Sequence, residues 1–522
     1  MGHLKTLDLI VIAAYMAGVL GVGWWSSRRQ HDTEEYFVGS RSMHPLVAGI
    51  SIIASLVSTI SYLSNPGEMV KNGPSWAWQM LHAPISFVVV GFFIIPHIMK
   101  HKVTSGYQLL EQKFGMGVRQ AAAILFILSR IFWMGLVIFT CGFAASQVSG
   151  LPLSATLLTV GVIGMLYTVL GGIRAVMVTD VIQFIILIGG AWLSVAFIAV
   201  KTGGLTAWWP DWTSAQLSDL NWQRPKLLSL NPFDRLSVLS VALYGCSFWI
   251  LTATGDQVVI QRFLSTRDAR AARRSFGISI LGDWLTSATL FITGLALVGF
   301  YLRFPAQLPD PSMSLPGQAD ELFPHFIAAI LPAGLTGLLV AALFAAAMSS
   351  LDSGISSIST VLITDFSGVF THGCDTDAAR LARARWVGVG VGCVATAMSF
   401  AVSLVPGNNL LEVTVRVSSL LAAPLFVAFV LAFFDKRSTP AGAWAAIATG
   451  AILAIGLTYS GEILALFTGE TRPISITLIM PVSSLAAITA GIAVSRFTKT
   501  RETNGTIGTY GNKGTDAQRP VD

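Results

Sequence analysis

Long apolar stretches recur along the whole chain of 522 residues, and polar residues collect in the short segments between them. Most stretches approach the roughly 20 residues that a helix needs to cross a hydrocarbon core of about 30 Å. Backbone groups cannot stay unpaired in lipid, so the pattern predicts a bundle of helices. We expect an all-α integral membrane protein with about 13 transmembrane helices. They are expected at residues 8–26, 45–65, 76–98, 120–147, 153–170, 175–200, 237–260, 274–302, 330–364, 384–404, 409–433, 440–460 and 474–496.

The composition agrees with a membrane protein, because 53% of the residues are hydrophobic and only 11% are charged. A soluble domain carries about 25% charged residues. A soluble enzyme, a nucleic-acid-binding protein and a disordered protein are therefore excluded. The four cysteines are scattered along the chain and lack the spacing of a zinc site or of a disulfide framework.

The basic residues predict the orientation of the bundle. With the N-terminus outside, 23 of the 33 lysines and arginines fall in inward segments and eight in outward ones. Cytoplasmic loops are enriched in these residues, so we expect the N-terminus outside and the C-terminus in the cytoplasm. The predicted location is the cell (plasma) membrane, with a transmembrane domain over residues 1–497 and a disordered cytoplasmic tail over 498–522.

Three spans carry polar residues, which are costly in a membrane unless they line water, pair or bind something. The second span is rich in serine and stops at Asn65-Pro66-Gly67, and Gly245 and Thr252–Asp256 interrupt the seventh. In the third segment, 341–366, hydroxyl residues recur at steps of three and four, which places them on one helical face. Helix packing, a helix end at Pro66, and a cap made by Asp256 near Arg262 are structural alternatives that the sequence leaves open.

Spans two and seven begin two successive blocks of five helices. Five is odd, so the second block enters the membrane upside down relative to the first. We expect a 5+5 inverted repeat, with a first repeat at about 45–200 and a second at about 237–433. Transporters of this design place substrate and ion between helices that are broken in corresponding positions. Carbonyls freed by unwinding, together with serine hydroxyls, can replace the water around Na⁺.

Several motifs resemble the sodium:solute symporter family over nearly the full length of the chain. They are Glu35–Arg41 after the first span, Tyr167–Val176 with Thr179–Gln183, Gln257–Arg262, and Met348–Leu351. The resemblance implies the leucine-transporter-like inverted-repeat fold and sodium-driven uptake by alternating access.

By position, the resemblance implies a sodium site. Its ligands would be the carbonyls of Ala54, Val57 and Ala346 and the hydroxyls of Ser349 and Ser350. Asp180 matches a family acid that is linked to sodium coupling or to a second ion, although it could instead anchor its span near Arg174. Members that bind two sodium ions tend to carry a hydroxyl where this chain has Ala346, which favours one sodium per cycle.

The solute is less well defined. Sugar-carrying relatives have amide or carboxylate side chains at positions that align with Ser61, Met80 and Trp249, so a close copy of the sugar site is not expected. A small carboxylate or a polyol fits a pocket of hydroxyls and aromatic rings. The candidate lining residues are Ser61, Tyr62, His82, Trp249, Thr252 and Thr254, with an interfacial place for His82 as the alternative.

We therefore predict a sodium-coupled symporter that imports a small organic solute, resembling a monocarboxylate, a polyol or a sugar. Na⁺ is the expected coupling ion, without an organic cofactor. The expected partners are the solute and the lipid bilayer, with no nucleic acid, and the chain is expected to be monomeric. A solute sensor on the same fold is the alternative. An integral membrane enzyme is disfavoured because the inward loops show no metal-ligand cluster, nucleophile–base pair or phosphate loop.

Overall fold

The computed structural model describes residues 4–27, 33–101, 103–204, 206–209, 228–231, 234, 236–370, 376–404, 410–468 and 474–498. These residues form helices and connecting turns, and no strand occurs among them. Most of the predicted tail, 498–522, lies outside the described residues.

A helix lies at each of the thirteen expected spans. The first half of the chain contains α1 (Thr6–Ser27), α2 (Thr33–Val38), α3 (Pro45–Leu56), α4 (Thr59–Asn72), α5 (His82–Val89), α6 (Ile95–Met99), α7 (Gln108–Phe114), α8 (Met116–Ser149) and α9 (Leu153–Thr202). The second half contains α11 (Val238–Gly255), α12 (Gln257–Leu264), α13 (Ala269–Arg303), α14 (Ala319–His325), α15 (Leu335–Asp365), α16 (Ser367–Phe370), α17 (Asp377–Ser403), α18 (Leu410–Phe434), α19 (Pro440–Thr458), α20 (Ser460–Thr468) and α21 (Ile476–Phe497). Within the described ranges, 11 helices are long and apolar enough to cross a membrane, and Pro45–Leu56 and Leu153–Leu166 are shorter apolar helices.

The second expected span is broken, but not where the sequence suggested. The chain leaves the helical conformation at Val57 and Ser58, and the Ser58 hydroxyl caps α4 by accepting a hydrogen bond from the Ile60 N–H at 3.2 Å. The expected stop at Asn65-Pro66-Gly67 is wrong, because α4 continues through Pro66 to Asn72. Membrane helices tolerate proline where neighbours compensate. Here α13 approaches closely: a Cβ on Gly294 would lie 2.6 Å from the Pro66 carbonyl oxygen.

The break expected in the seventh span is confirmed at Asp256, which separates α11 from α12. Gly245 does not take part in this break and lies inside α11. A Cβ on Gly245 would meet the Gln79 carbonyl oxygen at 2.7 Å, so the glycine allows the 3-10 helix Gly73–Leu81 to approach α11.

Gly172 separates the two spans that α9 contains. Its φ of 58° is positive, a conformation that glycine adopts at little cost. The sequence placed the boundary between spans five and six close to this point.

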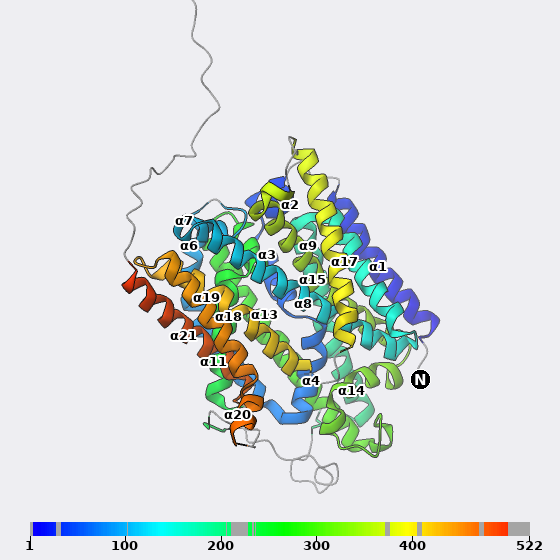
Figure 1. Cartoon of the computed structure of the whole chain (residues 1–522). Coiled ribbons are helices and arrows are strands. Elements are labelled where there is room, and N and C mark those ends of the chain that lie inside the picture. Colours follow the sequence, from blue (N-terminus) through cyan, green and yellow to red (C-terminus); the bar gives the residue numbers. More distant parts are fainter. Residues whose placement is uncertain are drawn as a thin grey trace, which may run out of the picture.

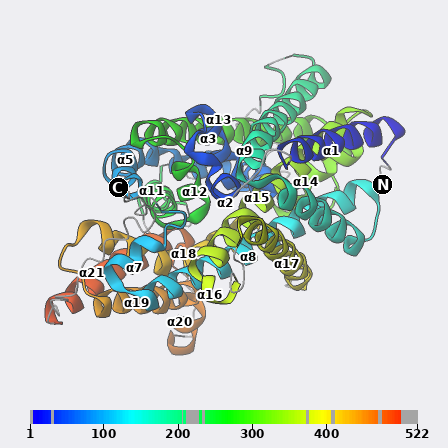
Figure 2. The ribbon, with the colours of Figure 1, turned by 90° about the horizontal axis from the view of Figure 1, so that it is seen from above.

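α15 forms the centre of the bundle and packs against α9, α8, α17 and α1. Almost every one of its residues is buried, including the hydroxyl residues that the sequence placed on one face. Hydroxyl groups in the middle of a membrane protein need partners, and those of α15 find them on α3 and α12. Figure 1 shows α19 and α21 at one edge of the bundle and α1 and α17 at the other, and Figure 2 shows the same separation of α19 and α21 from α1.

Candidate sodium and solute sites

The first helix break meets the hydroxyl face of α15. The Val57 N–H still bonds the Ile53 carbonyl, but the chain unwinds there, so the Ala54 and Ser55 carbonyls lack helical N–H partners further along. The Ser349 hydroxyl donates to the Ala54 carbonyl at 2.9 Å and also lies 3.2 Å from the Ala346 carbonyl oxygen. The Ser350 hydroxyl lies 3.4 Å from the Ser55 carbonyl oxygen.

Four of the five predicted sodium ligands therefore lie at one junction of α3 and α15, and Val57 is at the break itself. The junction offers neutral carbonyl and hydroxyl oxygens, which suit a hard monovalent cation. In the part of the chain that the structure describes, no group of three or more His, Cys, Asp or Glu side chains could hold a metal ion.

Asp180 of α9 lies in a buried hydrogen-bond network. The network includes Ser51 of α3 and Ser353 of α15, each about one turn from the junction described above. Asp180 Oδ2 accepts from the Ser51 hydroxyl at 2.5 Å and from Arg262 Nη2 at 3.2 Å. Arg262 also donates to the Ser353 hydroxyl at 2.5 Å, and Ser353 lies 2.7 Å from the Ser55 hydroxyl. Arg262 is thus the ion-pair partner of Asp180, whereas Arg174 is exposed.

The second helix break carries its own charge pair. Asp256 forms a buried ion pair with Arg130 of α8, and its other oxygen caps α12 by accepting from the Val258 N–H at 2.9 Å. The cap that the sequence left open is therefore present, but its arginine is Arg130 and not Arg262. This pair lines a small cavity of about 40 Å³, which we call the arginine cavity, together with Leu56, Ser129, Trp133, Phe248, Thr252, Ser418, Ala422 and Phe426.

A larger cavity of about 100 Å³, which we call the central cavity, adjoins the arginine cavity. The two cavities share Leu56, Trp133, Phe248 and Ser418 in their linings. The rest of the central cavity is lined by Ile53, Val57, Ser61, Asn65, Trp76, Gln79, Tyr244, Trp249, Asp283, Thr286, Ser287, Thr414 and Val415. Hydroxyl, amide and aromatic groups dominate this surface, and Val57 connects it to the first helix break.

The six predicted solute residues are divided among several places. Ser61 and Trp249 line the central cavity, and Thr252 lines the arginine cavity. Tyr62 is buried against Phe323, with ring centroids 5.6 Å apart, because neighbouring residues of a helix point in different directions. Thr254 donates to the Ile250 carbonyl of its own helix at 2.5 Å.

His82 is fully buried, so it is not the interfacial residue of the alternative interpretation. Its ring stacks on Trp249, with centroids 5.1 Å apart and an angle of 7° between the planes. Its Nε2 lies 3.3 Å from Asp283 Oδ2, and Asp283 faces the central cavity. His82 thus reaches the cavity through Asp283 and Trp249.

The sequence analysis missed Asp283. It is an acid in the middle of an apolar segment, Ile278–Leu285, and an ionisable residue at membrane depth is a functional candidate by default. That signal was present in the sequence. Trp76, Gln79 and Thr414 were also missed, and no comparable signal distinguishes them from packing residues.

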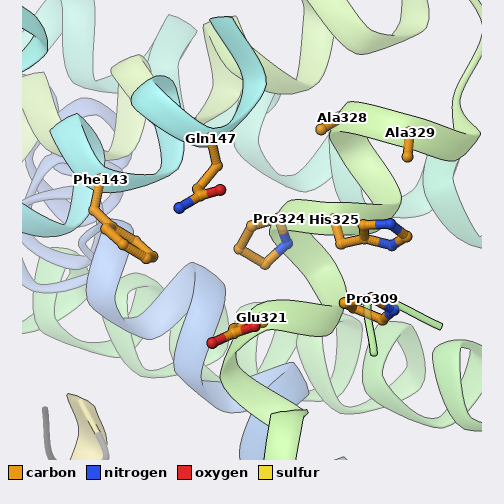
Figure 3. Close-up of a pocket in the computed structure, with 8 residues that line it drawn as sticks. All are labelled: Phe143, Gln147, Pro309, Glu321, Pro324, His325, Ala328 and Ala329. Atoms are coloured by element: carbon orange, nitrogen blue, oxygen red, sulfur yellow. The ribbon is translucent and has the colours of Figure 1, made fainter. Parts of the chain in front are cut away.

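A third cavity, of about 370 Å³, lies between the end of α8 and α14. Figure 3 shows its lining: Phe143 and Gln147 on α8, Glu321, Pro324 and His325 on α14, and Pro309, Ala328 and Ala329 nearby. None of the predicted site residues lines this cavity, so it is separate from the two described above.

Two interrupted helices that converge on a buried, hydroxyl-rich helix define a membrane transporter of the broken-helix type. Residues 36–450 match the profile of the sodium:solute symporter family, and the chain belongs to this family. The relatives described below are transporters. Consistent with this, the chain is a multi-pass membrane protein.

Relatives with several different solutes are similar to this chain. The sodium/sialic acid symporter SiaT of Proteus mirabilis is 26% identical over 473 residues, which cover 90% of this chain and 93% of the relative. The human sodium/iodide cotransporter is 26% identical, with 86% and 69% covered. The zebrafish (Danio rerio) sodium-coupled monocarboxylate transporter 2 is also 26% identical, with 88% and 72% covered.

Solved structures confirm the fold. The substrate-bound, outward-open structure of a Na⁺-coupled sialic acid symporter superposes with a TM-score of 0.80 at 23% identity, covering 95% of this chain and 98% of that one. MHP1, a nucleobase-cation-symport-1 family transporter, gives a TM-score of 0.53 at 13% identity, with 88% and 94% covered.

Proposed function

We propose that this protein is a sodium symporter that imports a small organic solute bearing a carboxylate, by alternating access and with one Na⁺ per cycle. The observation that carries the proposal is the contact of the Ser349 hydroxyl with the Ala54 carbonyl at the first helix break. Ala54, Val57, Ala346, Ser349 and Ser350 supply the sodium ligands in this proposal.

Sodium entry supplies the driving force. For a neutral or zwitterionic solute, the Na⁺ charge that crosses the membrane potential contributes about 2.3 kcal/mol per 100 mV, which corresponds to roughly fiftyfold accumulation. A carboxylate anion carried with one Na⁺ moves no net charge, so the sodium concentration gradient alone drives its uptake. Asp180 is held by Arg262, whose guanidinium already places one positive charge beside it. This neighbour supports a single sodium and a coupling role for Asp180 through the helices that it joins.

A carboxylate is favoured by the charge beside the cavity. A guanidinium has five N–H donors, so Arg130 can bind a solute carboxylate while one of its nitrogens stays paired with Asp256. The names of three relatives, which specify a monocarboxylate, iodide and sialic acid, support an anion. A polyol is the second candidate, because Ser61, Thr286 and Thr414 offer neutral hydroxyls in the central cavity.

Release into the cytoplasm requires that contacts around α12 break. The Tyr107 hydroxyl donates to the Gly255 carbonyl at 3.0 Å, and the Gln257 side chain bonds Gly106 N and Thr104 O, each at 2.9 Å. The Gln261 amide donates to the Phe37 carbonyl at 2.6 Å. In our proposal these bonds close the inner end while the two repeats, 45–200 and 237–433, rearrange around the central cavity.

Uptake into proteoliposomes tests the proposal. Radiolabelled lactate, alanine and inositol are offered with an inward Na⁺ gradient and, in parallel, with K⁺ in place of Na⁺. We expect at least one solute to accumulate only with Na⁺, and the Ser349→Ala variant to need more Na⁺. Ser357→Ala is the matched control, because that hydroxyl donates to the Gly354 carbonyl of its own helix at 3.1 Å.

The same assay separates symport from sensing. A sensor on this fold would bind a solute in the presence of Na⁺ without moving it, so vesicles would show binding and no accumulation. Equal accumulation with K⁺ and Na⁺ would contradict sodium coupling, and an unchanged sodium requirement in Ser349→Ala would contradict the proposed site.

A further inference from the structure

Among the described residues that line the central cavity, Asp283 is the only one with an acidic or basic side chain. It lies nine residues along α13 from Arg274, and a helix rises about 1.5 Å per residue, so the acid is about 14 Å deeper than the arginine. This distance is close to half of a hydrocarbon core of about 30 Å. The carboxylate is thus near the middle of the membrane.

Three other buried acids of the bundle are paired with arginine: Asp180 with Arg262, Asp256 with Arg130 and Asp365 with Arg119. Asp283 is paired with His82 through one oxygen, Oδ2, at 3.3 Å. A neutral imidazole has one N–H and one lone pair, so His82 can donate to Asp283 and accept from the Ser86 hydroxyl, which lies 3.3 Å from its Nδ1. In this arrangement Asp283 accepts one hydrogen bond from an uncharged ring.

The surroundings fix this pair in place. His82 is stacked on Trp249, and the neighbouring Trp284 donates its indole N–H to the Met80 carbonyl at 3.2 Å. The Asp283 side chain keeps 15% of its surface exposed, and it borders the central cavity. A carboxylate held rigidly against a cavity in the membrane is costly unless a donor from outside the protein completes its hydrogen bonds.

We propose that Asp283, positioned by His82, binds an ammonium or hydroxyl group of the solute, so that the transported class is an amino or hydroxy carboxylic acid. The inference rests on the proposed symport function and specifies its solute further. When Na⁺ is bound and the Arg130–Asp256 pair is counted as neutral, binding of an amino acid zwitterion gives a site that includes Asp283 a net charge of zero. A simple carboxylate would leave one negative charge uncompensated beside Asp283.

Net charge separates the amino acid from the other two acids, and hydrogen bonding separates the hydroxy acid from the unsubstituted acid. Hydrogen bonds to charged groups contribute more than those between neutral groups, so the ammonium group is the strongest partner for Asp283. A hydroxyl group is the next best, and an acid without either group is the weakest. The aromatic lining of the cavity, from Trp76, Trp133, Tyr244 and Phe248, suits either a short or an aromatic side chain on such an acid.

Matched acids test the proposal on the full-length purified protein. One series is propionate, lactate and alanine, and the other is phenylpropionate, phenyllactate and phenylalanine; within each series only the group on carbon 2 changes. Half-saturating concentrations come from thermal-shift titrations in NaCl, repeated in KCl. We expect the amino acids to bind at least about tenfold more tightly than the unsubstituted acids in NaCl, with the hydroxy acids between them.

Variants then assign the preference to Asp283. In Asp283→Asn the advantage of the amino acid over the unsubstituted acid should fall about tenfold or more, while the unsubstituted acid binds as before or more tightly. Glu462→Gln, which removes an exposed acid on α20, should leave the order unchanged. The ratio between matched acids is informative because a merely structural loss would weaken all three equally.

Three results would overturn the proposal: equal binding of the three acids in both series, equal weakening of all of them by Asp283→Asn, or no thermal shift with any of the six. The comparison of wild-type binding needs no variant, so it stands even where a variant folds poorly. Stabilisation by NaCl alone, without any acid, tests the sodium site separately. A sodium effect that persists while the solute order fails would leave the symport proposal intact and contradict only this inference.

Discussion

The two helix breaks share the same backbone arrangement but differ in charge. In each, the helix stops for one or two residues, and a side chain caps the helix that follows. Ser58 accepts from the Ile60 N–H, and Asp256 accepts from the Val258 N–H. The first break is neutral, and serines of α15 meet its free carbonyls. The second break carries an acid, and an arginine from α8 neutralises it.

In the proposed arrangement, unwinding a helix does not by itself create an ion site. A carbonyl freed by unwinding binds a cation only where no internal charge already satisfies the surroundings. At the first break the oxygens lie opposite other neutral oxygens, so a cation adds favourable interactions. At the second break Arg130 already places a positive charge, so the site favours an anion beside Arg130 or no ion at all.

The largest effect that we expect comes from breaking the charged pair. Asp256→Ala removes the cap of α12 and leaves Arg130 buried without its partner, and removal of one member of a buried pair typically destabilises by about 3–5 kcal/mol. Thermal and denaturant unfolding of the purified protein measure the loss. The double variant Arg130→Met/Asp256→Asn should be more stable than Asp256→Ala; if it is equally unstable, the ion pair is not the cause.

A smaller effect should follow at the neutral break. Ser349→Ala removes the hydroxyl that reaches both Ala54 and Ala346, and we expect the Na⁺ concentration for half-maximal uptake to rise about tenfold, which corresponds to about 1.4 kcal/mol. Ser350→Ala should act in the same direction but less strongly, because Ser350 makes a single contact of 3.4 Å. Uptake measured over a series of Na⁺ concentrations checks both, and the reverse order would contradict the proposed arrangement.

The fold was largely predictable from the sequence, because span length and hydroxyl periodicity are strong local signals. The apolar stretches located a helix at each expected span, and the steps between Ser349, Ser353 and Ser356 identified the face of α15 that meets α3 and α12. The polar segment Thr252–Asp256 located the second break. The first break was misplaced at Pro66, since α4 continues through this proline to Asn72.

The solute cavity was less predictable, because its lining depends on which way each residue of a helix points. Ser61 and Tyr62 are neighbours in sequence, yet only Ser61 borders the central cavity. Partners from distant segments, such as Arg130 for Asp256 and His82 for Asp283, arise from the packing of helices that the sequence does not order in space. Asp283 was the exception among the cavity residues, because an isolated acid in an apolar span can be recognised from the sequence alone.

The smallest effect should come from the cap at the neutral break, and it sharpens the comparison most directly. Ser58→Ala removes the side-chain acceptor from the start of α4 but leaves no charge unpaired, so the expected loss of stability is about 1 kcal/mol, typical of an N-cap serine. Ser58→Thr restores a hydroxyl acceptor in the same place and should recover part of this stability. Unfolding measurements on both variants check these outcomes. If Ser58→Ala destabilised the protein as strongly as Asp256→Ala does, backbone capping rather than charge pairing would explain the difference between the two breaks.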